Sequence, residues 1–186
     1  MMNSTRFLSA QTFEQMIAGA SENGDLWRAI GARATVSDDA VRRIEALSGH
    51  WHIAALSADW CFDSLGVVPY VAALAARASN LDLRVFERDA NPDLMDAHLT
   101  DITKRAIPVI MTFDDQFEAH GWWASRPQAL QKLVATEWNG MAKDALITEK
   151  RRWYAQDRGK HSVEATVALF EAAAHAQGAT PLISAR

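Results

Sequence analysis

Apolar residues follow two different spacings along the chain, and each change of spacing marks a predicted change of secondary structure. Through residues 1–50 they recur at intervals of three and four, which predicts amphipathic helices. Residues 52–56 then form an apolar run that predicts a buried strand. Helical spacing returns between Leu65 and Leu74, so we expect a helix that reaches about Ala78.

Three further apolar runs predict the rest of a sheet. They lie at residues 81–86, 107–113 and 117–122, and turn residues separate the last two. The resulting order β-α-β-α-β-β-α, framed by helices, predicts an α/β fold with a mixed sheet. Pro108 is unusual in this pattern, because a proline inside a central strand removes a hydrogen-bond donor from the ladder.

The remaining segments are predicted to be helical. Asn91 and Pro92 provide a cap and a first-turn proline for a short helix at residues 92–99. From residue 126 onward the spacing predicts a long segment to about residue 154. A last helix is expected at residues 162–174.

Composition narrows the class of protein. A chain of 186 residues, 49% hydrophobic and 23% charged, is typical of one soluble globular domain. It contains no apolar stretch of roughly 20 residues, and its start lacks the pattern of a secretory signal. A net charge of -4 offers no basic surface for nucleic acid. We therefore expect a cytoplasmic protein without membrane or nucleic-acid partners.

The candidate chemistry centres on Cys61, the single cysteine of the chain. It follows the first predicted strand and precedes the helix, so it faces that helix's free N–H groups and positive dipole end. These groups favour the thiolate, which is the reactive form of cysteine. Elsewhere in a chain, a lone cysteine is most often a small buried hydrophobe.

Several spaced features resemble the thioredoxin superfamily. They are the site Trp60-Cys61-Phe62-Asp63-Ser64, the helix proline Pro69, the segment Ala106-Ile107-Pro108-Val109 and the element from Gly121 to Pro127. The site is similar to the W-C-x-x-C motif with serine in the second cysteine position. The flanking helices resemble those of a bacterial subgroup with W-C-G-D sites.

This resemblance implies a single thioredoxin-like domain, with the central mixed sheet of the thioredoxin fold and added helices. Its core would span residues 51–130, with helical extensions at 1–50 and 131–176. Residues 177–186 are expected to form a frayed tail.

The resemblance also assigns roles. Cys61 would be the nucleophile and Ser64 its hydrogen-bond neighbour, while Trp60, Ile107 and Pro108 would line the substrate groove. Because a serine cannot form a disulfide, an external thiol such as glutathione would have to release the mixed disulfide. The partner would then be a protein disulfide or a small thiol, with no bound cofactor. The oligomeric state is left open.

Two positions depart from the usual thioredoxin pattern. Asp63 stands where thioredoxins usually carry proline, and its carboxylate raises the pKa of a neighbouring thiol. We expect Asp63 mainly to cap the first helical turn, with proton handling as the alternative. Ala55 matches the buried aspartate that many thioredoxins use as a proton acceptor. These departures keep a second interpretation open, in which the fold is a non-catalytic module that binds an extended peptide or partner.

We expect no metal site. The alternation Asp59, Cys61, Asp63 has no adjacent histidine, and the helix begins near Cys61. The six histidines of the chain share no motif.

Overall fold

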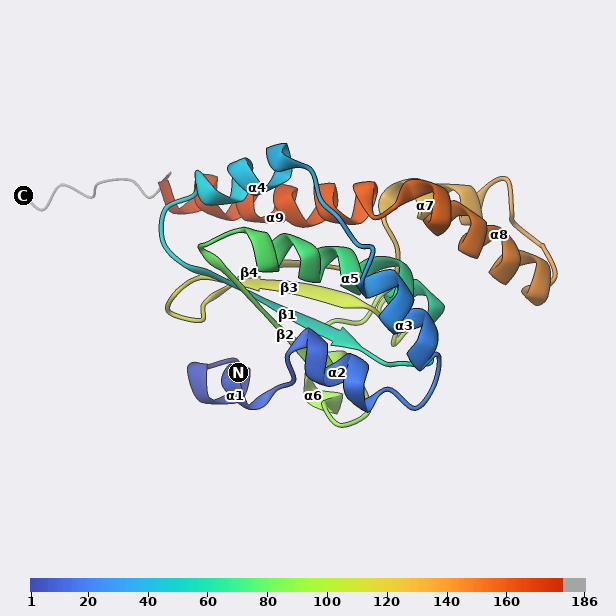
Figure 1. Ribbon diagram of the computed structural model, residues 1–186, viewed down its shortest axis with the longest axis horizontal. Coiled ribbons are helices and arrows are strands. Elements are labelled where there is room, and N and C mark those ends of the chain that lie inside the picture. The colour runs from blue at the N-terminus through green and yellow to red at the C-terminus, as the bar shows by residue number, and fades with distance from the viewer. Residues whose placement is uncertain (179–186) are drawn as a thin grey trace, which may run out of the picture.

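A four-stranded mixed sheet forms the centre of the protein in a computed structural model that describes residues 1–178 (Figure 1). Its strands are β1 (Trp51–Ser57), β2 (Leu81–Glu87), β3 (Val109–Phe113) and β4 (Ala119–Ala124). They lie in the order β2-β1-β3-β4, with β1 parallel to β2 and antiparallel to β3, and β3 antiparallel to β4. The predicted α/β fold with a mixed sheet is confirmed.

Helices cover both faces of this sheet. They are α1 (Ser4–Ser9), α2 (Phe13–Gly19), α3 (Gly24–Gly31), α4 (Asp38–Glu45), α5 (Phe62–Arg77), α6 (Pro92–Asp96), α7 (Gln128–Ala135), α8 (Lys143–Asp157) and α9 (Lys160–Gly178). Helices α4, α5 and α9 lie on one side of the sheet, and α1, α2 and α6 lie on the other (Figure 1). Among residues 1–178, none of these helices is long and apolar enough to cross a membrane.

Strand β1 is buried along its whole length because both faces of the sheet are covered. All seven of its residues are buried. Ile53 and Ala55 belong to the core beneath α5 and α9, whereas Ala54 and Leu56 belong to a second core that includes Phe7 of α1. This two-sided burial explains why the sequence of β1 is a continuous apolar run instead of an alternating one.

The N-terminal extension also reaches the outer edge of the sheet. Between α1 and α2, Gln11 forms an isolated antiparallel bridge with Val85 of β2. Its two backbone hydrogen bonds measure 3.2 and 2.8 Å between nitrogen and oxygen. The Arg6 side chain binds Asp93 of α6, with nitrogen–oxygen distances of 2.6 and 2.8 Å. Residues 1–50 are thus fixed to the sheet and to α6 instead of trailing from the core.

The C-terminal helices differ from the prediction in one respect. The long helical segment predicted from residue 126 to 154 is wrong, because the structure divides it into α7 and α8. Gly140 in the connection has a φ angle of 79°, a left-handed conformation that glycine adopts without strain. The predicted frayed tail at residues 177–186 lies outside the described residues, except for the last two residues of α9.

Pro108 does not interrupt the sheet as the sequence suggested. Strand β3 begins at Val109, so Pro108 lies just before the strand. The predicted strand at 107–113 therefore starts two residues later than expected.

Helix α5 packs against α8 at a point where only glycine fits. A Cβ atom added at Gly66 would overlap the aromatic ring of Tyr154, which is itself buried. We predict that Gly66→Ala lowers the free energy of unfolding by about 1–3 kcal/mol, the usual cost of overpacking. Chemical denaturation measures this change.

Gly19→Ala is the matched control. Gly19 is also helical, yet no atom lies within 4 Å of a Cβ added there. Its stability should change by less than about 1 kcal/mol, the range of helix propensity. Equal effects of the two substitutions would contradict the close packing of α5 against α8.

Candidate functional site

Cys61 is the N-cap residue of α5, directly after the turn that follows β1. Its Sγ atom accepts a hydrogen bond from the backbone N–H of Ser64, with a nitrogen–sulfur distance of 3.4 Å. The thiol also donates to the carbonyl oxygen of Ile107, 3.6 Å away. Since that carbonyl lies on the segment before β3, the sulfur joins two segments that are 46 residues apart.

The structure therefore brings four of the sequence-predicted site residues together. Cys61, Ser64, Ile107 and Pro108 lie at one end of the sheet, and the peptide bond between Ile107 and Pro108 is cis. Ser64 contacts the sulfur through its backbone N–H. Its hydroxyl group is buried and has no hydrogen-bond partner among the described residues.

Burial decides the ionisation of the thiol. Only 8% of Cys61 is exposed, and this burial raises the pKa of the thiol above its ordinary value. The charge of Asp63 adds to the increase, while hydrogen bonding from Ser64 opposes it. The expectation that the helix N-terminus would favour the thiolate is wrong in its net effect, because loss of hydration outweighs the helix N–H groups.

Asp63 is the centre of a buried polar cluster. Its Oδ2 atom accepts from Lys150 at 2.8 Å and from Arg126 at 3.4 Å, and its Oδ1 atom accepts from the Tyr154 hydroxyl at 3.0 Å. Lys150 and Tyr154 belong to α8, whereas Arg126 follows β4. Burial and the Asp63 charge raise the pKa of Tyr154 well above its ordinary value.

This cluster corrects the predicted capping role of Asp63. Cys61 itself is the N-cap of α5, and the Asp63 carboxylate points to α8 and Arg126. The sequence analysis did not identify Lys150, Arg126 or Tyr154. Lys150 lies within a run of charged residues typical of an exposed helix face, and no local signal distinguishes it from its neighbours.

No side chain replaces the missing proton acceptor of β1. Ala55 is fully buried in the core beneath α5, so it contributes only apolar surface. Asp63 is the nearest carboxylate in sequence, and two cations already occupy it. A proton leaving Cys61 must therefore pass to solvent or to a bound partner.

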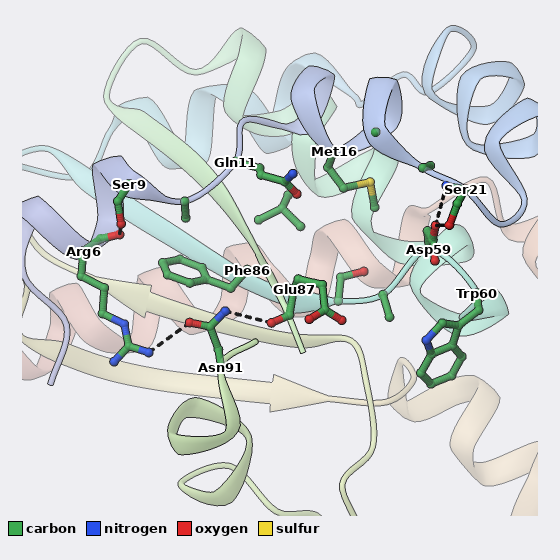
Figure 2. Close-up of a pocket in the computed structure, with 16 residues that line it drawn as sticks. Arg6, Ser9, Gln11, Met16, Ser21, Asp59, Trp60, Phe86, Glu87 and Asn91 are labelled. Atoms are coloured by element: carbon green, nitrogen blue, oxygen red, sulfur yellow. Dashed lines mark hydrogen bonds between the residues drawn. The ribbon is translucent and has the colours of Figure 1, made fainter. Parts of the chain in front are cut away.

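Trp60 points toward a different part of the surface. Its side chain is 39% exposed, and the guanidinium group of Arg88 lies 4.8 Å from the centre of its ring. It lines a cavity of about 610 Å³ together with residues of α1, α2 and β2, as Figure 2 shows. Cys61 and Pro108 do not line this cavity. The predicted role of Trp60 as a wall of the substrate groove stays a prediction.

The residues around Cys61 do not form a metal site in the described part of the chain. Asp59 accepts three hydrogen bonds from Ser21 and Glu22 in the segment before α3. Residues 1–178 contain one group of three potential metal ligands, and it lies at the other end of β1.

Comparison with known proteins places the chain in a family. A family description named Thioredoxin matches residues 10–143, which is most of the chain, so the protein belongs to the thioredoxin family. The match extends beyond the core predicted from the sequence and includes α2, α3 and α4. No curated protein matches the chain.

Two solved structures share the fold. One is a protein of unknown function from Pseudomonas aeruginosa, with a TM-score of 0.68 and 17% identity over 94% of this chain and 100% of that one. The other is an HIV epitope-scaffold, with a TM-score of 0.67 and 17% identity over 91% of this chain and 98% of that one. At this identity the likeness extends to the fold alone.

The Asp63 cluster predicts a measurable stabilisation by Tyr154. Tyr154→Phe removes the hydroxyl that donates to Asp63 but keeps the packed ring, so stability should fall by about 2 kcal/mol. Tyr70→Phe is the matched control, since the Tyr70 hydroxyl has no hydrogen-bond partner among residues 1–178. Urea denaturation compares the two variants, and equal losses would argue against a stabilising Tyr154–Asp63 bond.

The ionisation of Cys61 provides a second prediction. The rate of alkylation by iodoacetamide should rise with pH through an apparent pKa above the ordinary thiol value of about 8.5. Asp63→Asn removes a negative charge beside the sulfur, so it should lower this pKa and speed alkylation at pH 8. Glu149→Gln removes an equal charge from the surface of α8 and should leave the profile unchanged. A profile with a pKa well below 8.5 would contradict the effect of burial.

Proposed function

We propose that the protein carries out thiol-disulfide exchange of the monothiol type at Cys61. The Cys61 thiolate attacks a partner disulfide, one sulfur of that partner leaves as a thiolate, and a mixed disulfide forms. An external thiol such as glutathione then attacks the mixed disulfide and restores Cys61. The electrons for each cycle come from two molecules of the external thiol, which end as one disulfide.

One observation carries this proposal, namely the position of the Cys61 sulfur. It lies at the N-terminus of α5, where a backbone N–H points at it, and it touches the segment that precedes Pro108. Attack on a disulfide requires the substrate to approach the sulfur along such a segment. Ile107 and Pro108 would hold an extended substrate there, and Trp60 would contact the part of it that reaches the neighbouring surface.

The cations around Asp63 support the same function. Lys150 and Arg126 lie against the carboxylate and offset part of the negative charge that would otherwise oppose a thiolate at Cys61. Ser64 leaves the site without a resolving thiol, so the chemistry depends on an external one. The reducing cytoplasm expected from the sequence would supply glutathione and keep Cys61 reduced.

The raised pKa of Cys61 favours a second candidate, a non-catalytic thioredoxin-like module. Burial keeps the thiol protonated at neutral pH, and Ala55 provides no base to deprotonate it. In this candidate the surface beside Ile107 and Pro108 holds an extended peptide or partner protein without forming a covalent bond.

A turnover assay distinguishes the two candidates. With a small disulfide substrate and glutathione, the rate should increase by about tenfold per pH unit below the thiol pKa, because the thiolate fraction does. Cys61→Ser should reduce the rate to that of the uncatalysed reaction. Ser64→Cys should add dithiol activity that does not require glutathione.

The controls make the outcome decisive. The uncatalysed exchange between glutathione and substrate is measured at each pH and subtracted. A wild-type rate equal to that of Cys61→Ser at every pH would exclude exchange chemistry and leave the binding module.

A further inference from the structure

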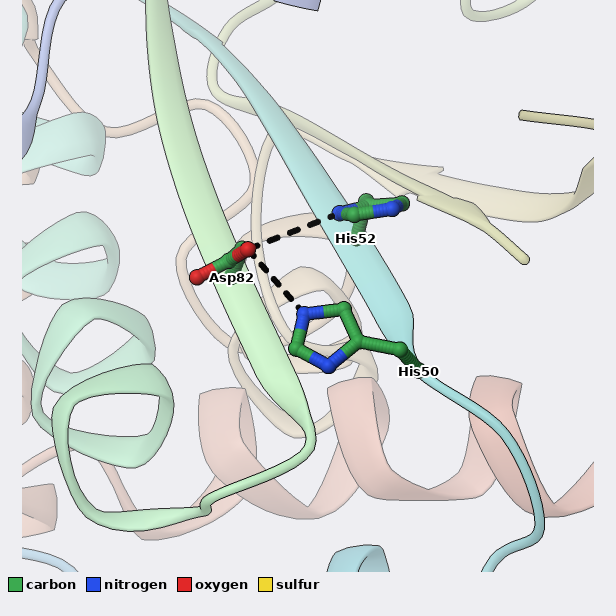
Figure 3. Close-up of side chains that lie close together, drawn as sticks. All are labelled: His50, His52 and Asp82. Atoms are coloured by element: carbon green, nitrogen blue, oxygen red, sulfur yellow. Dashed lines mark hydrogen bonds and ion pairs between the residues drawn. The ribbon is translucent and has the colours of Figure 1, made fainter. Parts of the chain in front are cut away.

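Two histidines and an aspartate converge at the end of β1 that lies farthest from Cys61. His50 precedes β1, His52 lies within it, and Asp82 of β2 is the register partner of His52. Figure 3 shows both imidazole rings directed at the same carboxylate. The Asp82 Oδ2 atom is 3.0 Å from His50 Nε2 and 3.9 Å from His52 Nδ1.

The His52 ring is held in place by aromatic neighbours. The Phe117 ring stacks on it at 4.4 Å with an interplanar angle of 4°, and the Phe7 ring lies 4.9 Å away. Only 9% of His52 is exposed. The ring is therefore fixed, with its Nδ1 atom on the side that faces Asp82.

That buried Nδ1 atom has no hydrogen-bond partner in the described part of the chain. A buried polar atom without a partner is costly, so it calls for a ligand or another explanation. The 3.9 Å gap to Asp82 is too long for a hydrogen bond. An ordinary ion pair between His50 and Asp82 accounts for the 3.0 Å contact but leaves His52 Nδ1 unsatisfied.

The charges around His52 suit a cation. Burial lowers the pKa of His52 and His50 lowers it further, so the ring is neutral at pH 7 and its nitrogen lone pair is free. Three carboxylates act on His52 in the opposite sense, those of Asp82, Asp115 and Asp114. A neutral imidazole in a negative field is the form in which histidine binds metal.

The distances are close to those of a metal centre. In a tetrahedral zinc site, donor atoms at the usual bond lengths lie about 3.3 Å from one another. The three donor atoms here all lie within 4.8 Å of one another. His50 and Asp82 have side chains that are 43% and 55% exposed, so small rotations of these two residues can close the site around the fixed His52 ring.

We propose that His50 Nε2, His52 Nδ1 and a carboxylate oxygen of Asp82 form a binding site for a zinc-type divalent cation. Two imidazoles and one carboxylate suit zinc and its neighbours in the first transition row, whereas magnesium and calcium prefer oxygen donors. The exposed side of the site leaves a fourth position for water. The metal would link β1 to β2, and it would satisfy the buried nitrogen of His52.

Metal binding to the purified protein tests the proposal. Tag-free protein treated with a chelator is titrated with zinc chloride at pH 7.5 by calorimetry, in the absence and presence of excess magnesium. We expect one zinc per chain in both cases, and an increase in Tm with zinc concentration that follows from binding to the folded state. His50→Gln and Asp82→Asn should each lower the affinity by at least about tenfold. Both residues are exposed enough that these variants should fold.

Two controls separate this site from other donors. His161→Gln removes a histidine that also pairs with an aspartate, Asp157, but lacks a second imidazole, so it should bind zinc like the wild type. Cys61→Ser should do the same, because Cys61 lies at the other end of β1.

The outcomes are as follows. Loss of binding in His50→Gln and Asp82→Asn but not in the two controls supports the site. Absence of zinc binding by the wild type would overturn it. So would binding that both His50→Gln and Asp82→Asn retain, or binding that Cys61→Ser abolishes.

Discussion

A single buried carboxylate joins the candidate site to the C-terminal half of the protein. Asp63 lies one turn into α5, and its three partners come from α8 and from the segment after β4. Removing an ion from water is costly, so Asp63, Lys150 and Arg126 are stable in this position only together. The position of α8 against α5, and with it the surface beside Cys61, depends on this group of charges.

The same cluster explains why a departure from the usual motif is tolerated. Elsewhere in the family proline occupies the position of Asp63, and an uncompensated acid there would both oppose the thiolate and remain buried. In this chain the added C-terminal helices supply the compensating charges. The extension and the unusual site residue are therefore two parts of one arrangement, and neither is explained without the other.

Local patterns were sufficient to predict most of the fold and the centre of the site. The alternation of spacings located all four strands, and the Trp60-Cys61 motif together with Pro108 indicated the family that the comparison shows. Local patterns could not show which distant residues meet. Lys150 and Tyr154 lie 87 and 91 residues from Asp63, and nothing in their own neighbourhoods marks them as buried. The pairing of His52 with Asp82 likewise depends on the register of β1 against β2, which a single sequence does not specify. The break between α7 and α8 was missed because helical spacing continues on both sides of it.

The bridge between Gln11 and Val85 has a consequence for association. The outward N–H and C=O groups of Val85 lie at an edge of the sheet, where unpaired backbone groups can recruit a strand from another chain. Gln11 satisfies both of them from within the same molecule. The N-terminal segment thus works as a built-in guard for this edge, and it directs any partner that adds a strand away from β2.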